Sequence, residues 1–292
     1  MSVFIHPGTK IITQGITGKT GRVYTELCMN YGVGKTSFVA GVNPKKAGEM
    51  IFDIPIYGTV KEAKEKTGAT VSVIYVPAPA ATAAIWEAVE ADLDVVVCTT
   101  EGVPVKDMLG LCSKMRSKEA QGGKKTLLLG PGSPGIMIPE VLKIGMIPDF
   151  MCRRGGVGVV TNSGAVMYEA FALLEQVGLA PSCIVGLGRG SILGLKSIDV
   201  LQALNTDVDT EAVVLIAETG GADITETAKW YQKHMSKPVV VYIAGMEQPL
   251  KWYMSGRCAE RQNNQKKIEE IARSYGFKVA RTLADISALL RG

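Results

Sequence analysis

The sequence predicts an α/β protein with two parallel sheets, each covered by helices on both faces. Short runs of β-branched and apolar residues alternate with helical patterns along the whole 292-residue chain. Because successive positions in these runs are apolar, both faces of the strands are expected to be buried, as in parallel sheets. A passage rich in Gly, Arg and Pro, residues 148–156, divides the chain. We therefore expect one doubly wound domain in residues 1–150 and a second in 151–292.

The strands expected in the first half are aliphatic runs that end at Gly, Pro, Asn or a hydroxyl residue. They are 10–14 (KIITQ), 37–42 (SFVAGV), 70–76 (TVSVIYV), 94–98 (DVVVC) and 126–129 (TLLL). The helices between them carry apolar residues at helical spacing and are rich in Ala, Leu, Lys and Glu. They are 22–31, 80–91 and 106–116.

The second half repeats this alternation. Its expected strands are 157–160 (VGVV), 182–185 (SCIV), 212–217 (AVVLIA), 238–243 (PVVVYI) and 278–280 (KVA), and its helices are 165–177, 225–235 and 265–275. In such sheets ligands bind on the loops outside the carboxyl ends of the strands. The candidate residues are therefore sought in those loops.

Composition excludes several classes of function. The net charge of +4 is small and scattered, so nucleic acid is not an expected partner, although the balance suits an anionic ligand. The six cysteines lie far apart with no C-x-x-C pair, which predicts reduced thiols rather than disulfides or a metal site. No stretch reaches membrane-spanning length, and the start lacks the features of a signal peptide. We expect a cytoplasmic protein, or a mitochondrial matrix protein after removal of a presequence.

The segment GITGKTG, residues 15–21, follows an expected strand and precedes an expected helix. Its G-x-x-G-x-x-G spacing fits neither a Walker loop, G-x-x-x-x-G-K-[ST], nor the dinucleotide fingerprint G-x-G-x-x-G. A second GKT, residues 34–36, follows the helix that it should precede, and we interpret it as a helix-ending turn. The first segment is well placed to bind an anion, but a nucleoside triphosphate is not favoured.

Eight loops rich in Gly, Pro and hydroxyl residues follow expected strands, five of them in the first half. They are 15–21, 43–48, 76–79, 99–102, 130–135, 161–164, 186–191 and 218–221. Any one of them could be an ordinary turn, because glycine is common there. Together they indicate a long ligand lying across strand ends, with phosphate oxygens bound by backbone N–H groups at helix starts.

Taken in order, these loops resemble those of the α subunit of succinyl-CoA synthetase (succinate–CoA ligase, NDP-forming). The most specific segments are QGITG (14–18), TGATVSVIYVPAP (67–79), TEGVP (100–104), SGAVMYE (163–169) and KPVVVYIAG (237–245). The resemblance runs from residue 4 to about 245 and resumes at 280–287. It implies a CoA-binding Rossmann-like domain followed by a flavodoxin-like domain, in an enzyme of the tricarboxylic acid cycle.

The resemblance also implies which residues bind coenzyme A. Thr17, Gly18, Lys19 and Thr20 match the loop that holds the CoA phosphates, Lys46 matches a CoA-contacting lysine, and Thr99, Thr100 and Glu101 match a further CoA-contacting segment. Nucleotide and Mg²⁺ are expected only on the partner, an ATP-grasp β subunit. Both GKT segments are then unrelated to nucleotide binding.

The family mechanism uses a phosphorylated histidine that carries the phosphoryl group from the nucleotide to the carboxylate substrate. That histidine lies in a G-H-A-G-A loop after the strand that ends YIAG. Here the segment 246–264 contains no histidine, and the chain has only His6 and His234. We expect structural roles for both, since His6 precedes the first strand and His234 ends a helix, where it complements the helix dipole.

Other parts of the implied phosphate site remain. Glu218 matches the glutamate that hydrogen-bonds the phosphohistidine, Ser163 and Gly164 match the helix start that faces the phosphoryl group, and Tyr168 matches a substrate-contacting tyrosine. The family segment G-G-D-P-I-P-G reads GRGSILG at 188–194, and so loses its acid. Cys258, flanked by Arg257 and Arg261, is a disfavoured substitute nucleophile.

Three functions remain open from the sequence. The chain could be a subunit of an acid–CoA ligase, with the carrier supplied by another chain or replaced by direct transfer. It could be a non-catalytic paralogue that binds CoA or acyl-CoA and regulates or assembles with an active complex. An NAD(P)-dependent oxidoreductase fits worst, because an acid should end the second strand. That strand is followed by Asn-Pro-Lys-Lys at 43–46.

Overall fold

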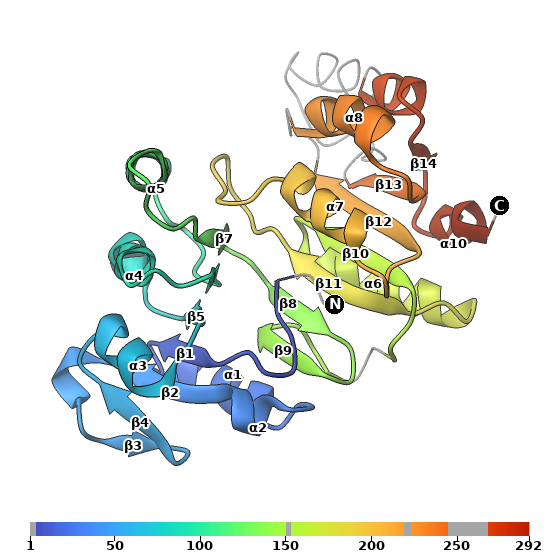
Figure 1. The fold of residues 1–292 in the computed structure, drawn as a ribbon. Helices are drawn as coiled ribbons and strands as arrows, with labels where there is room; N and C mark the ends of the chain where they lie inside the picture. The colour runs from blue at the N-terminus through green and yellow to red at the C-terminus, as the bar shows by residue number, and fades with distance from the viewer. Residues whose placement is uncertain (1–3, 150–152, 219–222, 245–267, 292) are drawn as a thin grey trace, which may run out of the picture. The chain divides into compact units, whose positions relative to one another are not determined.

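The computed structural model describes residues 4–149, 153–218, 223–244 and 268–291, and it contains two seven-stranded sheets (Figure 1). Residues 2–150 together with 185–195 form one compact unit, and residues 151–184 with 196–292 form the other. The boundary that we predict near residue 150 remains a prediction. No helix in the described ranges combines the length and the apolar character needed to cross a membrane.

The first sheet has the strand order β3-β4-β2-β1-β5-β6-β7. Its strands are β1 Ile11–Gln14, β2 Phe38–Val42, β3 Met50–Ile51, β4 Ile54–Tyr57, β5 Val71–Ile74, β6 Val95–Cys98 and β7 Leu127–Leu129. Its helices are α1 Lys19–Met29, α2 Gly34–Ser37, α3 Val60–Thr67, α4 Ala78–Glu90 and α5 Val105–Ala120, with a 3-10 turn η1 at Pro44–Lys46. Every residue of β1, β5 and β6 is buried, which confirms that these strands are covered on both faces.

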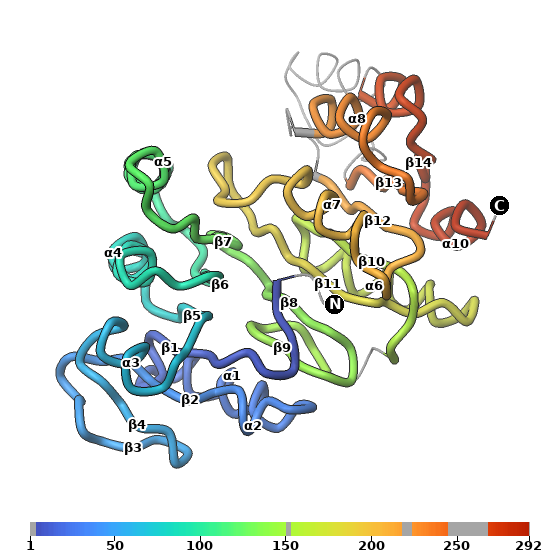
Figure 2. Tube along the Cα trace, viewed as in Figure 1, coloured from blue at the N-terminus to red at the C-terminus, as the bar shows by residue number. Residues whose placement is uncertain are grey.

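The second sheet has the order β14-β13-β12-β10-β11-β8-β9. Its strands are β8 Gly135–Ile138, β9 Leu142–Gly145, β10 Val157–Thr161, β11 Pro181–Gly186, β12 Ala212–Glu218, β13 Val239–Ala244 and β14 Lys278–Ala280. Its helices are α6 Gly164–Gln176, α7 Ser197–Thr206, α8 Asp223–His234 and α10 Asp285–Arg291, and residues 268–274 are also helical. Helices α7 and α8 pack against each other, and the Cα trace of both is drawn in Figure 2.

The expectation of purely parallel sheets needs one correction. Strand β3 pairs antiparallel with β4, and β8 pairs antiparallel with β9. Both pairs are joined by tight turns, which connect only antiparallel neighbours, because a parallel pair needs a long crossover. The pairings of β1 with β2 and β5, of β5 with β6, and of β12 with β10 and β13 are parallel, so the α/β class with parallel-rich sheets is confirmed.

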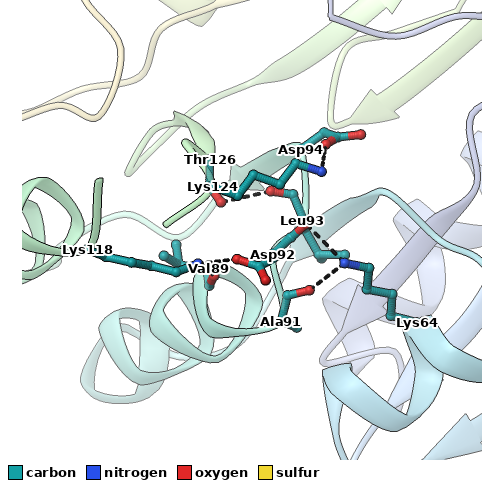
Figure 3. A network of polar contacts seen from close by, with 9 residues as sticks. All are labelled: Lys64, Val89, Ala91, Asp92, Leu93, Asp94, Lys118, Lys124 and Thr126. Carbon is teal, nitrogen blue, oxygen red and sulfur yellow. Dashed lines mark hydrogen bonds and ion pairs between the residues drawn. The ribbon is translucent and has the colours of Figure 1, made fainter. Parts of the chain in front are cut away.

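A lysine network closes the first sheet at the amino ends of its strands (Figure 3). Lys64 donates to the carbonyl oxygens of Ala91 and Asp92 at 2.8 and 3.1 Å, and Lys118 donates to the carbonyl of Val89 and to the Asp92 carboxylate. These carbonyls end or follow α4, so the ammonium groups satisfy C-terminal acceptors and complement the helix dipole. The hydrogen bond from Lys118 lowers the pKa of Asp92. The polar groups at the amino ends of these strands are thus bonded within the chain. Candidate ligand sites are therefore sought at the carboxyl ends.

Candidate functional site

The carboxyl end of β1 lies at the point where the strand order of the first sheet reverses. Strand β1 pairs with β2 on one side and with β5 on the other, both in parallel register. The chain leaves β1 through α1 to reach β2, and later crosses back to reach β5. Such a reversal opens a crevice between the outgoing loops, where doubly wound sheets bind their ligands. The loop of residues 15–18 is therefore at the expected position.

Two glycines shape this loop. Gly15 has φ +93°, and a Cβ there would lie 3.2 Å from the carbonyl carbon of Tyr75 and the nitrogen of Val76. A Cβ on Gly21 would lie 2.2 Å from the carbonyl oxygen of Gly15, a distance that no side chain tolerates. The first turn of α1 is thus pressed onto the loop that precedes it. The G-x-x-G-x-x-G spacing has a packing reason that is separate from the Walker and dinucleotide patterns.

The start of α1 has the properties of an anion site. Its N-cap is Gly18, which supplies no side-chain cap, and the first turn contains no acidic residue. Gly18, Lys19 and Thr20 are exposed, and Thr17 is half-buried. Uncapped N–H groups at a helix start, with the positive end of the dipole and a lysine beside them, attract phosphate oxygens.

The loop after β2 carries the second predicted cation. Lys46 ends η1, and its Nζ lies 3.1 Å from Oε2 of Glu49, with both side chains about half exposed (48% and 54%). Asn43 was not among the predicted site residues, yet its Nδ2 donates to Thr17 Oγ1 at 2.7 Å and so joins this loop to the one after β1. An Asn-Pro pair predicts a local turn, but only the parallel register of β1 and β2 shows what the amide reaches.

The third predicted segment follows β6, and its residues differ in exposure. The Thr99 side chain is buried (5%) and its Oγ1 donates to the carbonyl of Ile74 at 2.9 Å. Thr100 Oγ1 donates to the carbonyl of Val76 at 2.6 Å, while Glu101 is exposed. The two threonine hydroxyls therefore tie β6 to the end of β5, and they shape the site wall rather than present donors to a ligand.

Loop 186–195 joins this same compact unit. The nitrogen of Arg189 donates to the carbonyl of Pro131 at 3.0 Å, and Gly132 donates to the carbonyl of Thr100 at 2.9 Å. A Cβ on Gly188 would lie 2.2 Å from the Pro131 oxygen, so this close approach requires glycine. Loop 186–191 is thus hydrogen-bonded to loop 130–135, which in turn is hydrogen-bonded to the segment after β6.

The second half brings its predicted residues to neighbouring strand ends. Strand β10 ends at Thr161, and Ser163 occupies the N-cap position of α6, which begins at Gly164. Tyr168 follows one turn later and is half-buried. Thr161 Oγ1 accepts from the nitrogen of Ser163 at 2.9 Å, and Ser163 itself supplies no side-chain cap. The start of α6 is therefore a second helix N-terminus suited to an anion.

Glu218 ends β12 beside this helix start. In the parallel register Thr161 pairs with Ile216, which places the backbone of Glu218 two residues further along β12. On the other side Glu218 pairs with Ala244, the last residue of β13. The segment in which the family histidine would occur begins directly after Ala244 and lies outside the described residues. Its sequence contains no histidine.

Both histidines have structural surroundings. His6 Nδ1 accepts from the nitrogen of Gly8 at 3.1 Å, and His234 ends α8 with its ring 5.6 Å from that of Trp230.

The interpretation of the second GKT segment as a helix-ending turn is wrong. Gly34–Ser37 is a one-turn helix that leads into β2, not the end of α1. Thr36 Oγ1 donates to the carbonyl of Val33 at 2.9 Å, so its hydroxyl serves that turn.

Within the described ranges no cluster of three or more His, Cys, Asp or Glu side chains is arranged to hold a metal ion. The cysteines there, Cys28, Cys98, Cys112 and Cys183, are free thiols. Burial raises the pKa of Cys28 and Cys98 to about 11 and that of Cys183 to about 12. Such thiols stay protonated and act as small core residues.

Comparison with known proteins identifies both halves. Residues 7–102 match the family "CoA binding domain", and residues 154–291 match "Succinyl-CoA ligase like flavodoxin domain". The chain is 43% identical over 293 aligned residues to the succinate–CoA ligase [ADP-forming] subunit alpha of Staphylococcus aureus, covering 99% of this chain and 94% of that protein. The chain belongs to the succinate–CoA ligase α-subunit family. The corresponding subunit of Staphylococcus epidermidis is 45% identical over 249 residues.

Solved structures share the fold at lower identity. ATP citrate lyase from Methanothrix soehngenii, in complex with citrate and coenzyme A, superposes with a TM-score of 0.80 at 21% identity. The match covers 99% of this chain and 50% of that one, so this chain spans half the length of the lyase chain. The dinucleotide-forming acetyl-coenzyme A synthetase 1 of Ca. Korarchaeum cryptofilum superposes with a TM-score of 0.71 at 20% identity over 94% of this chain and 58% of its own.

Proposed function

We propose that this α-family chain is the CoA-binding subunit of an NDP-forming acid–CoA ligase. The reaction is succinate, CoA and NTP giving succinyl-CoA, NDP and phosphate, and the partner is an ATP-grasp β subunit that holds nucleotide and Mg²⁺. The observation that carries the proposal is the uncapped start of α1 at the reversal point of the first sheet, within a segment that matches a CoA-binding domain.

In this proposal the CoA phosphates bind where the backbone is open. The N–H groups of Lys19 and Thr20 and the ammonium groups of Lys19 and Lys46 supply donors and positive charge. Gly18, whose own N–H donates to the carbonyl of Gly15 at 3.0 Å, has no side chain and lets the ligand approach the backbone closely. Thr17 supplies a hydroxyl, and the segment containing Thr99, Thr100 and Glu101 forms the wall after β6. The end of β2 carries Asn43 where a dinucleotide enzyme places an acid, which favours CoA over NAD.

The second half supplies the acyl-transfer site. Ser163 and Gly164 begin a helix whose dipole favours a phosphate or a carboxylate, Glu218 lies at the adjacent strand end, and Tyr168 is the proposed substrate contact. The thiol of CoA attacks the carbonyl carbon of the acyl phosphate and forms the carbon–sulfur bond. The carbon–oxygen bond to phosphate breaks, and phosphate leaves with the proton that the thiol loses. In this proposal Ser163 and Gly164 bind that leaving phosphate.

The alternative is a non-catalytic paralogue that binds CoA or acyl-CoA and assembles with an active ligase or lyase. One observation favours it: the sequence contains no histidine in 245–264, where the family carries its phosphorylated residue. In the ligase proposal, another chain supplies the carrier or the phosphoryl group passes directly to the acid. In both proposals the isolated chain has no ligase turnover.

Co-purification of the native complex, followed by a succinyl-CoA assay with ATP or GTP, distinguishes the two proposals. Turnover that disappears with the Glu218→Gln variant supports the ligase subunit. A complex that turns over equally with Glu218→Gln, while this chain still binds CoA, supports the paralogue. Failure of the wild-type chain to bind CoA in a calorimetric titration contradicts both.

A further inference from the structure

Asn43 connects the two loops that form the proposed CoA phosphate site. Its Nδ2 lies 2.7 Å from Thr17 Oγ1 on the loop after β1, and its Oδ1 accepts from the nitrogen of Lys45 at 2.9 Å on the loop after β2. Its own backbone nitrogen donates to the carbonyl of Tyr57 at 3.0 Å, which holds the residue at the end of β2. One side chain thus fixes both loops.

The orientation of the Asn43 amide follows from its partners. The nitrogen of Lys45 can only donate, so the atom that it contacts must be the amide oxygen. The other end of the amide, which faces Thr17, is therefore the NH₂ group. Because Nδ2 donates and Thr17 Oγ1 accepts, the bond does not use the hydroxyl hydrogen of Thr17.

The hydroxyl of Thr17 is left as a donor. Thr17 directly precedes Gly18, the N-cap of α1, and among the hydrogen bonds of the described residues none has the Thr17 hydroxyl as donor. Phosphate oxygens accept hydrogen bonds but cannot donate when fully ionised. A threonine at this place helps to bind phosphate only if its hydrogen is available.

We propose that Asn43 is a positioning residue that holds the Thr17 hydroxyl as a hydrogen-bond donor for a phosphate group of CoA. This inference rests on the proposed CoA site and assigns it a specific residue. A carboxylate at position 43 would accept from Thr17 and reverse the direction of the bond, and its charge would oppose the phosphate. An amide is the isosteric group that avoids both effects.

A double-mutant cycle in the full chain tests the proposal, with CoA affinity measured by calorimetry. Asn43→Ala is expected to bind CoA about fivefold to tenfold more weakly, the effect of losing roughly one neutral hydrogen bond. Thr17→Val is expected to bind at least as weakly. Because both substitutions remove the same donor, the double variant should fall within about twofold of the weaker single variant.

Asn43→Asp separates positioning from folding. The carboxylate keeps the acceptor for Lys45 and should unfold at a higher temperature than Asn43→Ala, yet it should bind CoA more weakly than Asn43→Ala. If Asn43 had a purely structural role, the more stable of the two variants would also bind CoA more tightly. The opposite order is therefore evidence for positioning. Asn205→Ala is the matched control, since Asn205 also bridges two segments, with bonds to His234 and Ser236, and belongs to the other compact unit. Its CoA affinity should equal that of the wild type.

Additive effects of Asn43→Ala and Thr17→Val, or tighter CoA binding by Asn43→Asp than by Asn43→Ala, would overturn the role of Asn43 while leaving the CoA site in place. Unchanged affinity in all three single variants would do the same. A wild-type chain that binds no CoA would overturn this inference and the proposed function together.

Discussion

Lys46 is held at the site by a weak interaction. Its ammonium group pairs with Glu49 at 3.1 Å, and about half of each side chain is exposed. Exposed pairs of this kind contribute at most about 1 kcal/mol, because solvent screens them. In the proposed CoA site, a phosphate bound at α1 would replace Glu49 as the partner of Lys46 at a small cost in free energy.

Lys46→Glu should weaken CoA binding by roughly tenfold or more, since a charge-assisted hydrogen bond is lost and a like charge is introduced. Titration calorimetry on the full chain measures this. Lys61→Glu is the control, because it makes the same charge change on the exposed first turn of α3. Equal affinity of Lys46→Glu and wild type would place the ligand elsewhere, and NAD affinity comparable with that of CoA would favour an oxidoreductase.

The buried thiols predict a pH dependence of stability. Burial raises the pKa of Cys183 from 9.0 to about 12, so between these values the unfolded chain loses a proton that the folded chain keeps. Stability is therefore fully present below pH 9 and falls as pH rises toward 12. Urea unfolding at pH 8.5 and 10.5 should show a smaller loss for Cys183→Ala than for wild type. An equal loss would show that this thiol does not ionise on unfolding.

At the scale of elements, the β1–loop–α1 unit depends on a close contact that only glycine permits. Gly21→Ala would place a Cβ 2.2 Å from the Gly15 oxygen, so α1 must shift and its N–H groups move with it. We expect destabilisation by about 1–3 kcal/mol together with weaker CoA binding. Chemical unfolding and calorimetry measure the two effects.

Gly110→Ala is the matched control for that substitution. Gly110 lies inside α5, and a Cβ there would have no heavy atom within 4 Å. Alanine should therefore stabilise the chain by up to about 1 kcal/mol through its better helix propensity, with CoA affinity unchanged. Destabilisation by Gly110→Ala as large as that by Gly21→Ala would contradict the steric account.

The long elements were predictable because burial on both faces leaves an unmistakable apolar run. The runs at 94–98 and 212–217 became β6 and β12 with small shifts of their ends. The missed strands were short, such as the two residues of β3, or lay in a Gly-rich hairpin, such as β8 and β9. A two-residue strand is too short to show a periodicity. Strands β8 and β9 are as long as β6, but they lie among Gly and Pro residues, which indicate a loop.

The sequence predicts at which edge of the sheet the candidate site lies, but not the hydrogen bonds of its side chains. Parallel strands end at one edge, so the loops that should gather there could be named from the sequence. Which hydroxyls point inward depends on the register between strands. The sequence therefore predicts Thr99 as a CoA contact without showing that its hydroxyl donates to the carbonyl of Ile74, and it does not single out Asn43.

At the scale of the whole molecule, the chain aligns with a ligase α subunit over nearly all of its length but has no histidine in 246–264. It covers 94% of the Staphylococcus aureus subunit, and both family domains are matched. A covalent carrier divides a difficult phosphoryl transfer into two easier steps, so its loss should cost orders of magnitude in rate. The relatives are α subunits of a ligase that works with a β subunit, and the catalytic capacity of this chain must be tested in such a complex.

Restoring a G-H-A-G-A loop should raise activity if the carrier alone is missing. The substitutions are Ser255→Gly, Gly256→His, Arg257→Ala and Cys258→Gly, within the segment outside the described residues. Succinyl-CoA formation by the complex with a β subunit should exceed that of wild type by at least tenfold. The same loop with Gly256→Gln in place of histidine is the control. Equal rates for the histidine and glutamine loops would contradict a carrier deficit.

The central claim is that this chain binds CoA as a ligase α subunit but carries no phosphohistidine of its own. Incubation of the native complex with γ-labelled ATP, followed by separation of the chains and tracing of the acid-labile label, tests it most directly. We expect no acid-labile phosphate on this chain, while CoA still binds to it. Stoichiometric acid-labile label on His6 or His234, together with turnover that depends on that residue, would contradict the claim.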